Sequence, residues 1–441
     1  MSLNLKFCAI KDLAAQVAYL RSPIAIRDRC TQLFQLACSD QLRYFRCDFS
    51  QLERVADYGI AVIRQQYPDL QIPFHSRWRH FEGGNGSRLN LLNTQLQNLS
   101  PLEKAQAKFD LAIVSVLLDA GAGATWQYIE EQSRQTYRRS EGLAVASFWM
   151  FCQGAFSSDP TRLQVDAIAL QTLNETTLAE GLQVSATNPL VGLQGRTQLL
   201  QQLGETLSRY PQLFRSDSSS LLRPGHLVNY LLNQAENGQI AATQVLSAVL
   251  TGFSDIWPGR ITLAGTNLGD TWPHPALASP HPPDADGINR LSTLPPQSPI
   301  PDPRSLIPFH KLSQWLTYSL LEPLQELGLE ITELNALTGL PEYRNGGLFV
   351  DLGVLQVKDK IVLHQAQRPG SEAIVEWRAL TVILLDQVAE IMRQKLNLTA
   401  AELPLVKVLQ GGTWAAGRQI AAELRPEGTP PIQIESDGTV F

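Results

Sequence analysis

The chain has 441 residues, of which 44% are hydrophobic and 18% are charged. Soluble proteins carry about 25% charged residues, so this composition excludes a disordered chain and predicts a large buried core. The length predicts enough core for two or three domains. The formal net charge of −6 argues against binding to nucleic acid or to an anionic membrane through overall charge.

The five cysteines occur without CxxC spacing, and their number is odd. We therefore expect neither a disulfide framework nor a thiolate zinc site, and we predict the reducing cytoplasm as the compartment. The longest nearly apolar stretch, residues 111–124, contains Asp119 and is shorter than the ~20 residues that span a bilayer. The sequence thus predicts no membrane span.

Residues 1–270 are predicted to form a helical N-terminal part. Apolar residues recur at helical spacing in five segments, 13–20, 60–63, 104–120, 197–207 and 241–251. The segment 104–120 follows the start signal Ser100-Pro101, ends before Gly121 and is apolar around nearly its whole circumference. This pattern predicts a central, buried helix.

Residues 271–308 are predicted to be a proline-rich strap or linker. Eleven of the 27 prolines lie between Trp272 and Pro308, and they leave little room for helix or sheet. A plain linker and an ordered strap or lid over a site both stay open, because long loops in compact chains are often functional.

Residues 309–441 are predicted to form a C-terminal helical part. Helices are expected over 308–328, with a bend at Pro323, over 371–396 and after Gly412. Strand-favouring residues between Leu348 and His364 predict a β-hairpin. The predicted fold class is therefore mainly α, a multi-helix globular fold with one small β element in the C-terminal third. We expect the two helical parts to pack as one unit.

Charged residues inside apolar helices are the first candidates for a site. Glu376 and Arg378 lie among apolar residues of the predicted helix 371–396, so they either form a structural ion pair or line a polar pocket. Asp119 ends the central helix, and Trp126 follows a glycine-containing turn. A carboxylate beside an aromatic ring suits recognition of a sugar or base; a structural cap is the alternative.

Two segments are candidate anion sites. Thr413 can cap a helix that carries Trp414 and Arg418, and free N–H groups at such a start attract phosphate; a plain helix start explains the same residues. Within residues 74–81, His75 and Arg77 predict the basic wall of a pocket.

Metal and cofactor motifs are sparse. Asp270 and His274 form a DxWxH string, but two ligands do not make a zinc site. The motifs HExxH, GxSxG, CxxC and GxGxxG do not occur in the sequence. The sequence therefore predicts no metal and no cofactor.

Nine longer strings are spread in order over most of the chain. They are LDAGAG (118–123), SEGLA (140–144), NPLVGLQGR (188–196), IWP (256–258), DTWPH (270–274), PFHKLSQWL (308–316), LTGLPEYRNGG (337–347), EWRAL (376–380) and GGTWAAGR (411–418). Together they resemble the uracil catabolism protein 4 family, also called domain of unknown function 1688. That family is linked with a route that converts uracil to a nucleotide, opens its ring and cleaves the resulting (phospho)ribosylurea to urea and a sugar. The resemblance implies cleavage of the ribose–urea bond.

A second resemblance points to the same chemistry. LPEYR (340–344) followed by EWRA (376–379) is similar to the queuosine salvage N-glycosidase family, where a DYR string precedes an EIRA string. Glu342 stands where that family has Asp, so the role of that carboxylate does not transfer directly. The family is mostly helical and hydrolyses an N-glycosidic bond.

The leading hypothesis is therefore an N-glycoside hydrolase that needs no cofactor. A carboxylate must stabilise an oxocarbenium-like sugar, and we expect Asp351 or Asp119 in this role, with Glu342 as the alternative. Other candidates follow from the same hypothesis: Arg344, Arg378 and Arg418 for a 5′-phosphate, Trp126 or Trp414 for stacking, and His75, Arg77, Asp270, His274 and Glu376 for other substrate contacts.

Two rival functions stay open. One is a non-catalytic binding or scaffold protein of the same pathway. The other is a metal-dependent amidohydrolase that acts on the urea group. In each case the expected partner is a small molecule, and the residues leave the oligomeric state undetermined.

Overall fold

The computed structural model describes residues 13–83, 87–216, 220–257, 260–277, 302–426 and 428–435. Helices dominate it, as the sequence predicts. The helices of the first 270 residues are α1 Leu13–Leu20, α2 Pro23–Cys38, α3 Leu52–Gln66, α4 Arg77–Phe81, α5 Ser87–Gln95, α6 Pro101–Leu117, α7 Arg139–Cys152, α8 Ala167–Thr172, α9 Glu175–Gly181, α10 Leu193–Arg209, α11 Pro211–Phe214, α12 Leu227–Gln234 and α13 Ala242–Gly252. Those of the remainder are α14 Lys311–Glu326, α15 Tyr343–Asp351, α16 Ile361–His364, α17 Glu372–Leu396, α18 Leu405–Lys407, the π-helical turn η7 Val408–Thr413 and α19 Trp414–Leu424.

The strands of the described residues are short, and three of their five pairs, β1–β10, β4–β9 and β7–β8, join segments that are distant in sequence. They are β1 Phe45–Cys47, β2 Gln127–Ile129, β3 Thr136–Arg138, β4 Gln239–Ala241, β5 Thr262–Leu263, β6 Thr266–Asn267, β7 Thr271–Pro273, β8 Leu306–Pro308, β9 Glu330–Thr332 and β10 Leu355–Val357. They form two-stranded sheets in the pairs β1–β10, β2–β3, β4–β9, β5–β6 and β7–β8. Only β4–β9 is parallel; the other four pairs are antiparallel.

The predicted central helix is confirmed as α6. Ser100 and Glu103 form a reciprocal capping box at its start, and Pro101 occupies the first turn. All residues from 105 to 117 except Lys108 are buried. Its buried Asp110 accepts hydrogen bonds from Arg223 and from two backbone N–H groups, and is therefore a structural anchor.

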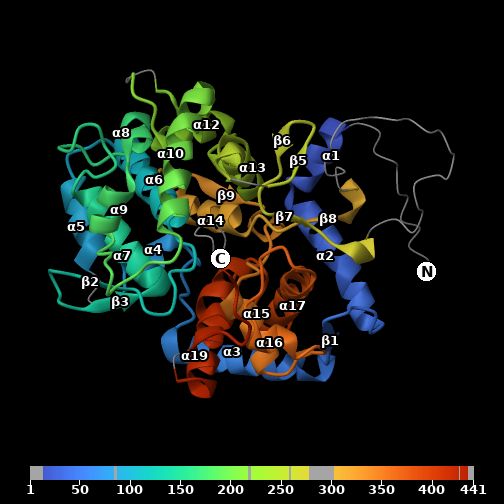
Figure 1. Ribbon diagram of the computed structural model, residues 1–441. Helices are drawn as coiled ribbons and strands as arrows, with labels where there is room; N and C mark the ends of the chain where they lie inside the picture. The colour runs from blue at the N-terminus through green and yellow to red at the C-terminus, as the bar shows by residue number, and fades with distance from the viewer. Residues whose placement is uncertain are drawn as a thin grey trace, which may run out of the picture.

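The N-terminal helices pack directly on the C-terminal ones. Helix α17 lies against α2 and α3, and α19 also lies against α3, as Figure 1 shows for the blue and red ends of the chain. One continuous hydrophobic core contains buried residues from Ile26 to Ile432. No helix in the described part of the chain has the length and apolarity that a membrane crossing requires.

The predicted β-hairpin between residues 348 and 364 is wrong. Residues 343–351 form α15 instead, and β10 pairs with β1 across the core. The Glu342 carboxylate accepts the N–H groups of Arg344 and Asn345 at 2.7 and 2.6 Å, which starts the helix. Gly346 lets α15 approach α17 closely, because a Cβ there would lie 2.7 Å from the Trp377 ring. Capping and helix packing thus override the strand propensity.

Most of the predicted proline-rich strap, residues 278–301, lies outside the described residues. Its two described ends form β7 and β8, which pair antiparallel with Thr271 opposite Pro308. This pairing brings Asp270 next to the start of α14, where its carboxylate accepts the N–H of Lys311 at 3.1 Å.

Candidate functional site

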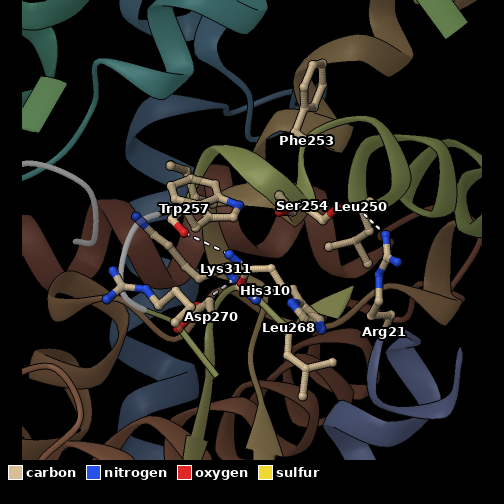
Figure 2. Close-up of a pocket in the computed structure, with 14 residues that line it drawn as sticks. Arg21, Leu250, Phe253, Ser254, Trp257, Leu268, Asp270, His310 and Lys311 are labelled. Carbon is tan, nitrogen blue, oxygen red and sulfur yellow. Dashed lines mark hydrogen bonds between the residues drawn. The ribbon is translucent and has the colours of Figure 1, made fainter. Parts of the chain in front are cut away.

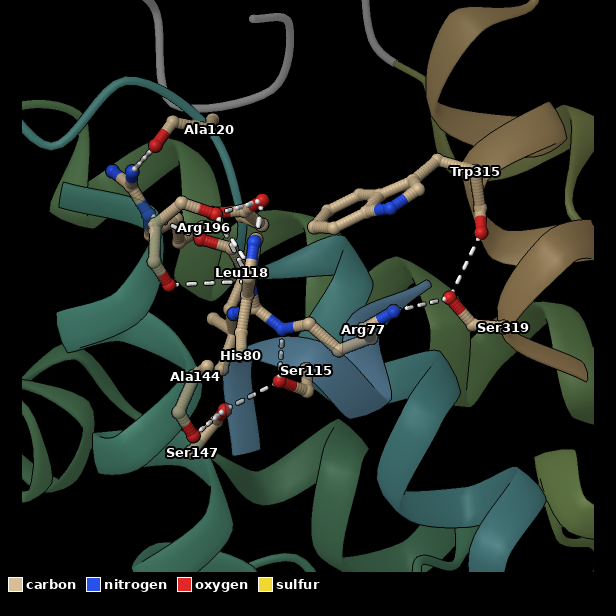
Figure 3. Close-up of polar contacts among 12 residues, drawn as sticks. Arg77, His80, Ser115, Leu118, Ala120, Ala144, Ser147, Arg196, Trp315 and Ser319 are labelled. Atoms are coloured by element: carbon tan, nitrogen blue, oxygen red, sulfur yellow. Dashed lines mark hydrogen bonds and ion pairs between the residues drawn. The ribbon is translucent and has the colours of Figure 1, made fainter. Parts of the chain in front are cut away.

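A buried ion pair forms the floor of the candidate site. Asp119 follows the end of α6, and Arg77 begins α4; Asp119 Oδ2 lies 3.2 Å from Arg77 Nη1. Ser140 donates a hydrogen bond to the same carboxylate oxygen at 2.7 Å. Arg77 also donates to Ser115, and its backbone N–H donates to Ser319, beneath the ring of Trp315 (Figure 3). These contacts fix both charges in position.

Four rings form what we call the aromatic box: His75, His80, Trp315 and Trp414. Ring centroids of His80 lie 5.5 Å from Trp315 and 5.4 Å from Trp414, and His75 lies 5.2 Å from Trp414. Rings from α4, α14 and α19 and from the segment before α4 thus gather in one cluster. Such a group can hold a planar or sugar-like ligand by stacking.

Both histidines of the aromatic box are neutral. Burial lowers the pKa of His75 to about 4, and burial together with Arg77 lowers the pKa of His80 well below its ordinary value. Arg77 Nη1 lies 3.2 Å from His80 Nδ1, so Nδ1 is the acceptor and the proton is on Nε2. His80 therefore presents an N–H donor at Nε2.

Lys311 and Glu342 add opposite charges beside the aromatic box. The Lys311 ammonium lies 5.7 Å from the Trp315 ring centroid and has no hydrogen bond or ion pair with any described residue. Burial lowers the pKa of Lys311, which the nearby Asp119 and Glu342 oppose. Burial raises the pKa of Glu342, against the effect of its backbone hydrogen bond from Arg344 and of the Lys311 charge. A cation and two carboxylates thus face one region without closing on one another.

Three buried polar atoms of this group lack a hydrogen-bond partner among the described residues: Arg77 Nη2, His80 Nε2 and Trp315 Nε1. Leaving a buried donor unsatisfied costs about 1–3 kcal/mol, so native proteins seldom do so without a reason. All three atoms belong to neighbouring residues of this group and can donate a hydrogen bond. A polar ligand with several acceptor atoms would satisfy them.

Two further predicted residues border this region. The Arg418 guanidinium lies 5.0 Å from the Trp414 ring and forms an ion pair with Glu141. Arg344 instead lies over its neighbour Tyr343 and donates to the Gly428 carbonyl at 2.7 Å. Arg418 is thus adjacent to the aromatic box, whereas the Arg344 guanidinium is held by backbone.

The predicted anion site at the start of α19 is absent. The π-helical turn η7 runs directly into α19, and Thr413 has helical φ and ψ values of −71° and −41°. Its N–H groups therefore belong to a continuing helix and are not a free N-terminus. Trp414 joins the aromatic box by its ring alone.

Asp351 and Trp126 have structural partners away from the aromatic box. Asp351 ends α15, and its two oxygens accept from Arg425 at 2.9 and 2.6 Å. Trp126 is fully buried and donates to the Leu182 carbonyl at 3.0 Å. The structure brings Asp119, Glu342, His75 and Arg77 together and leaves these two apart.

Asp270 and Arg378 form a buried two-pronged ion pair, with both N–O distances at 2.7 Å. Burial of Asp270 works against ionisation, but Arg378 outweighs it and lowers the Asp270 pKa. Glu376, two residues earlier in α17, accepts the N–H groups of Arg43 and Tyr44 at 3.0 and 2.9 Å. The charges of the predicted helix 371–396 therefore have structural partners, and Asp270 orients the start of α14.

Residues 19–441 match the family described as "Protein of unknown function (DUF1688)". The chain belongs to this family. It is 38% identical over 456 aligned positions to "Uracil catabolism protein 4" of Lachancea kluyveri, covering 96% of this chain and 99% of that protein. It is 40% identical over 435 positions to "Protein urg3" of Schizosaccharomyces pombe (strain 972 / ATCC 24843), again covering 96% and 99%. The family resemblance predicted from the sequence strings is confirmed.

Among the residues that the structure describes, one group has ligand atoms close enough for a metal ion. One atom each of His274, Glu372 and Glu376 lie within 4.8 Å of one another. However, His274 Nδ1 accepts the N–H of Ala276 at 3.2 Å, which places the imidazole proton on Nε2, the atom facing Glu376 at 3.8 Å. This arrangement favours a neutral histidine directed at a carboxylate over a histidine ligand.

Sequence reasoning placed His80 only within the basic segment 74–81, and it gave no role to three other residues of the site: Ser140, Lys311 and Trp315. His80 is three residues after Arg77 in a segment already predicted as a pocket wall, so helical spacing was the available signal. Lys311 and Trp315 lie in the string PFHKLSQWL (308–316), but this string assigns them no role, because a lysine and a tryptophan at a helix start are ordinary surface and core residues. Their role depends on where β7 and β8 place α14.

Proposed function

We propose that the protein hydrolyses the N-glycosidic bond of a ribosylurea or a related N-ribosyl compound in uracil catabolism. A relative that is 38% identical over nearly the whole chain carries uracil catabolism in its name, which supports the pathway. One observation supports the chemistry most: two buried carboxylates, Asp119 and Glu342, lie with unpartnered donors around the aromatic box.

In this reaction a water oxygen bonds to C1′ of the ribose as the bond from C1′ to the urea nitrogen breaks. The departing nitrogen gains a proton, and the water loses one. The sugar passes through an oxocarbenium-like state, which the fixed Asp119 carboxylate stabilises. Glu342, whose pKa burial raises, exchanges the proton. The aromatic box excludes bulk water and holds the planar urea group.

The test is urea release from N-ribosylurea and from its 5′-phosphate, measured by mass spectrometry. We expect urea together with ribose or ribose 5-phosphate from the wild-type protein. Asp119→Asn and Glu342→Gln should each reduce the rate at least about a hundredfold. Asp159→Asn, at a side chain that is 47% exposed, is the matched control and should keep the wild-type rate. Wild-type protein that leaves both compounds intact would overturn the proposal.

A metal-dependent amidohydrolase is the second candidate, favoured only by the group His274, Glu372 and Glu376. It would break the urea group and release ammonia, so the products separate the two functions. A scaffold protein would raise its melting temperature with these compounds without changing them. Release of ammonia by the wild-type protein, and loss of this release in the His274→Ala variant, would support the amidohydrolase.

A further inference from the structure

Three cations and three carboxylates lie near the first turns of α14. They are Arg77, Lys311 and Arg378, and Asp119, Asp270 and Glu342. Two pairs are in direct contact: Arg77 Nη1 lies 3.2 Å from Asp119, and Arg378 binds Asp270 through two contacts of 2.7 Å. Lys311 and Glu342, 8% and 7% exposed, are left over. Neither forms an ion pair with a described residue, so one buried cation and one buried carboxylate lack a direct ionic partner.

The fold fixes the position of Lys311 at the first residue of α14. The Asp270 carboxylate accepts its backbone N–H at 3.1 Å. The preceding His310, with a φ of 47°, donates from Nε2 to the Leu20 carbonyl at 2.8 Å. Figure 2 shows Lys311, His310 and Asp270 close together at this point. The Lys311 ammonium then lies 5.7 Å from the centroid of the Trp315 ring, so its place depends on the surrounding backbone and not on a salt bridge.

Glu342 depends on Lys311 for its charge. Its carboxylate accepts the backbone N–H groups of Arg344 and Asn345. Burial raises the pKa of Glu342, and the Lys311 charge opposes this rise more strongly than the Arg344 guanidinium does. That guanidinium donates to the Gly428 carbonyl at 2.7 Å instead. Lys311 is therefore the main side-chain charge that favours the ionised form of Glu342.

The other charged or titratable groups around this pair are matched or neutral. They are the ion pairs Arg378–Asp270, Arg77–Asp119 and Arg418–Glu141, and the side chains of His75, His80 and Tyr343. Burial keeps the two histidines neutral by lowering their pKa, and it keeps the tyrosine neutral by raising its pKa to about 12. Because each of these groups is paired or uncharged, none among the described residues replaces the charge of Lys311.

We propose that Lys311 is a positioning residue that controls, through its charge, when Glu342 gives up and takes back its proton. The positive charge stabilises the carboxylate form, whereas burial stabilises the protonated form. These opposing effects keep both forms accessible, as proton exchange requires. Arg77 differs, because it binds Asp119 directly and holds that charge in place. The effect of Lys311 on Glu342 is independent of the reaction; its part in turnover rests on the proposed hydrolysis.

The first experiment follows the protonation of Glu342 without substrate. Infrared difference spectroscopy records the carboxyl C=O band of the whole protein during a pH titration, and Glu342→Gln identifies the band by removing it. In Lys311→Met we expect Glu342 to stay protonated up to a pH about one unit higher than in the wild-type protein, the effect of losing one nearby opposite charge. Lys311→Arg keeps the charge and should titrate close to the wild type.

The matched control is Lys360→Met, because Lys360 is exposed and the substitution is the same. It should leave the band unchanged. Circular dichroism checks the folding of each variant, and Lys311→Gln is the second neutral variant. An unchanged titration in the folded neutral variants overturns the proposal. A shift in Lys311→Arg as large as in Lys311→Met also overturns it, since charge would then not be the cause.

The second experiment measures kcat/KM against pH for whichever of N-ribosylurea and its 5′-phosphate the protein cleaves. We expect the limb of the profile set by Glu342 to move to higher pH in Lys311→Met, by the amount of the infrared shift. A merely structural loss would lower the rate at every pH without moving the limb. An infrared shift without urea release by the wild-type protein keeps the effect of Lys311 and overturns the hydrolase. Turnover with an unmoved profile and an unmoved band keeps the hydrolase and overturns the role of Lys311.

Discussion

The indole nitrogen of Trp78 lies 2.7 Å from the backbone oxygen of Ser319. Ser319 is four residues before Pro323 in α14, and proline has no N–H with which to close that helical hydrogen bond. Trp78, from α4, supplies the missing donor. The bend-prone proline and the wall of the candidate site are therefore coupled through one hydrogen bond.

This coupling predicts a non-additive pair of substitutions. Trp78→Phe should lower the free energy of unfolding by about 2–4 kcal/mol, because it leaves a buried carbonyl unsatisfied and opens a small cavity. In the Pro323→Ala background the new N–H of residue 323 can donate to the Ser319 carbonyl. Trp78→Phe should then lower the free energy of unfolding by about 1 kcal/mol less than it does in the wild-type background. Urea denaturation of the four proteins measures this difference. Equal costs in both backgrounds would refute the coupling.

A second double-mutant cycle concerns Asp119 and Arg77. Asp119→Asn should lower the free energy of unfolding by about 3 kcal/mol, because it leaves the fully buried Arg77 without a counter-charge. Arg77→Gln should cost a similar amount. The double variant should cost clearly less than the sum, since it removes both charges. Additive losses in denaturation experiments would show that the two charges do not depend on each other.

Asp351 should matter for stability more than for turnover. Its carboxylate is 5% exposed and pairs with Arg425, so Asp351→Asn should lower the free energy of unfolding by about 1–3 kcal/mol. Urea release should stay within about threefold of wild type, because Asp119 and Glu342 carry the proposed chemistry. A variant that melts normally but releases no urea would return Asp351 to the mechanism.

His75 should make stability depend on pH. Burial lowers its pKa to about 4 in the folded protein, below the ordinary 6.5, so the unfolded chain binds the proton more readily. Neutral His75 therefore leaves the free energy of unfolding at its full value above pH 6.5. As the pH falls from 6.5 toward 4, proton uptake by the unfolded chain lowers that free energy. Between pH 7 and 4, the wild-type protein should therefore lose up to about 3 kcal/mol more than His75→Gln. Parallel stability curves for the two proteins would contradict this assignment.

Local sequence patterns predicted those parts of the fold and site that local forces decide. Helix α6 carries its own capping box and apolar surface. Asp119 lies at the end of this helix and Arg77 lies in the basic segment 74–81, as the sequence predicts. The hairpin prediction failed because the Glu342 cap and the contact between Gly346 and Trp377 are decided by other parts of the chain. Lys311 became a site residue only through the pairing of β7 with β8, which no local pattern encodes.

Because of the π-helical turn η7, the site depends on the number of residues in segment 408–413 as well as on which residues they are. A π turn holds one residue more than an α turn, so every residue after it is rotated by about 100° relative to a regular helix. Trp414 and Arg418 face His75 and Glu141 only because of that rotation. Removing one residue from 408–413 would keep every functional side chain and still turn this wall of the aromatic box away.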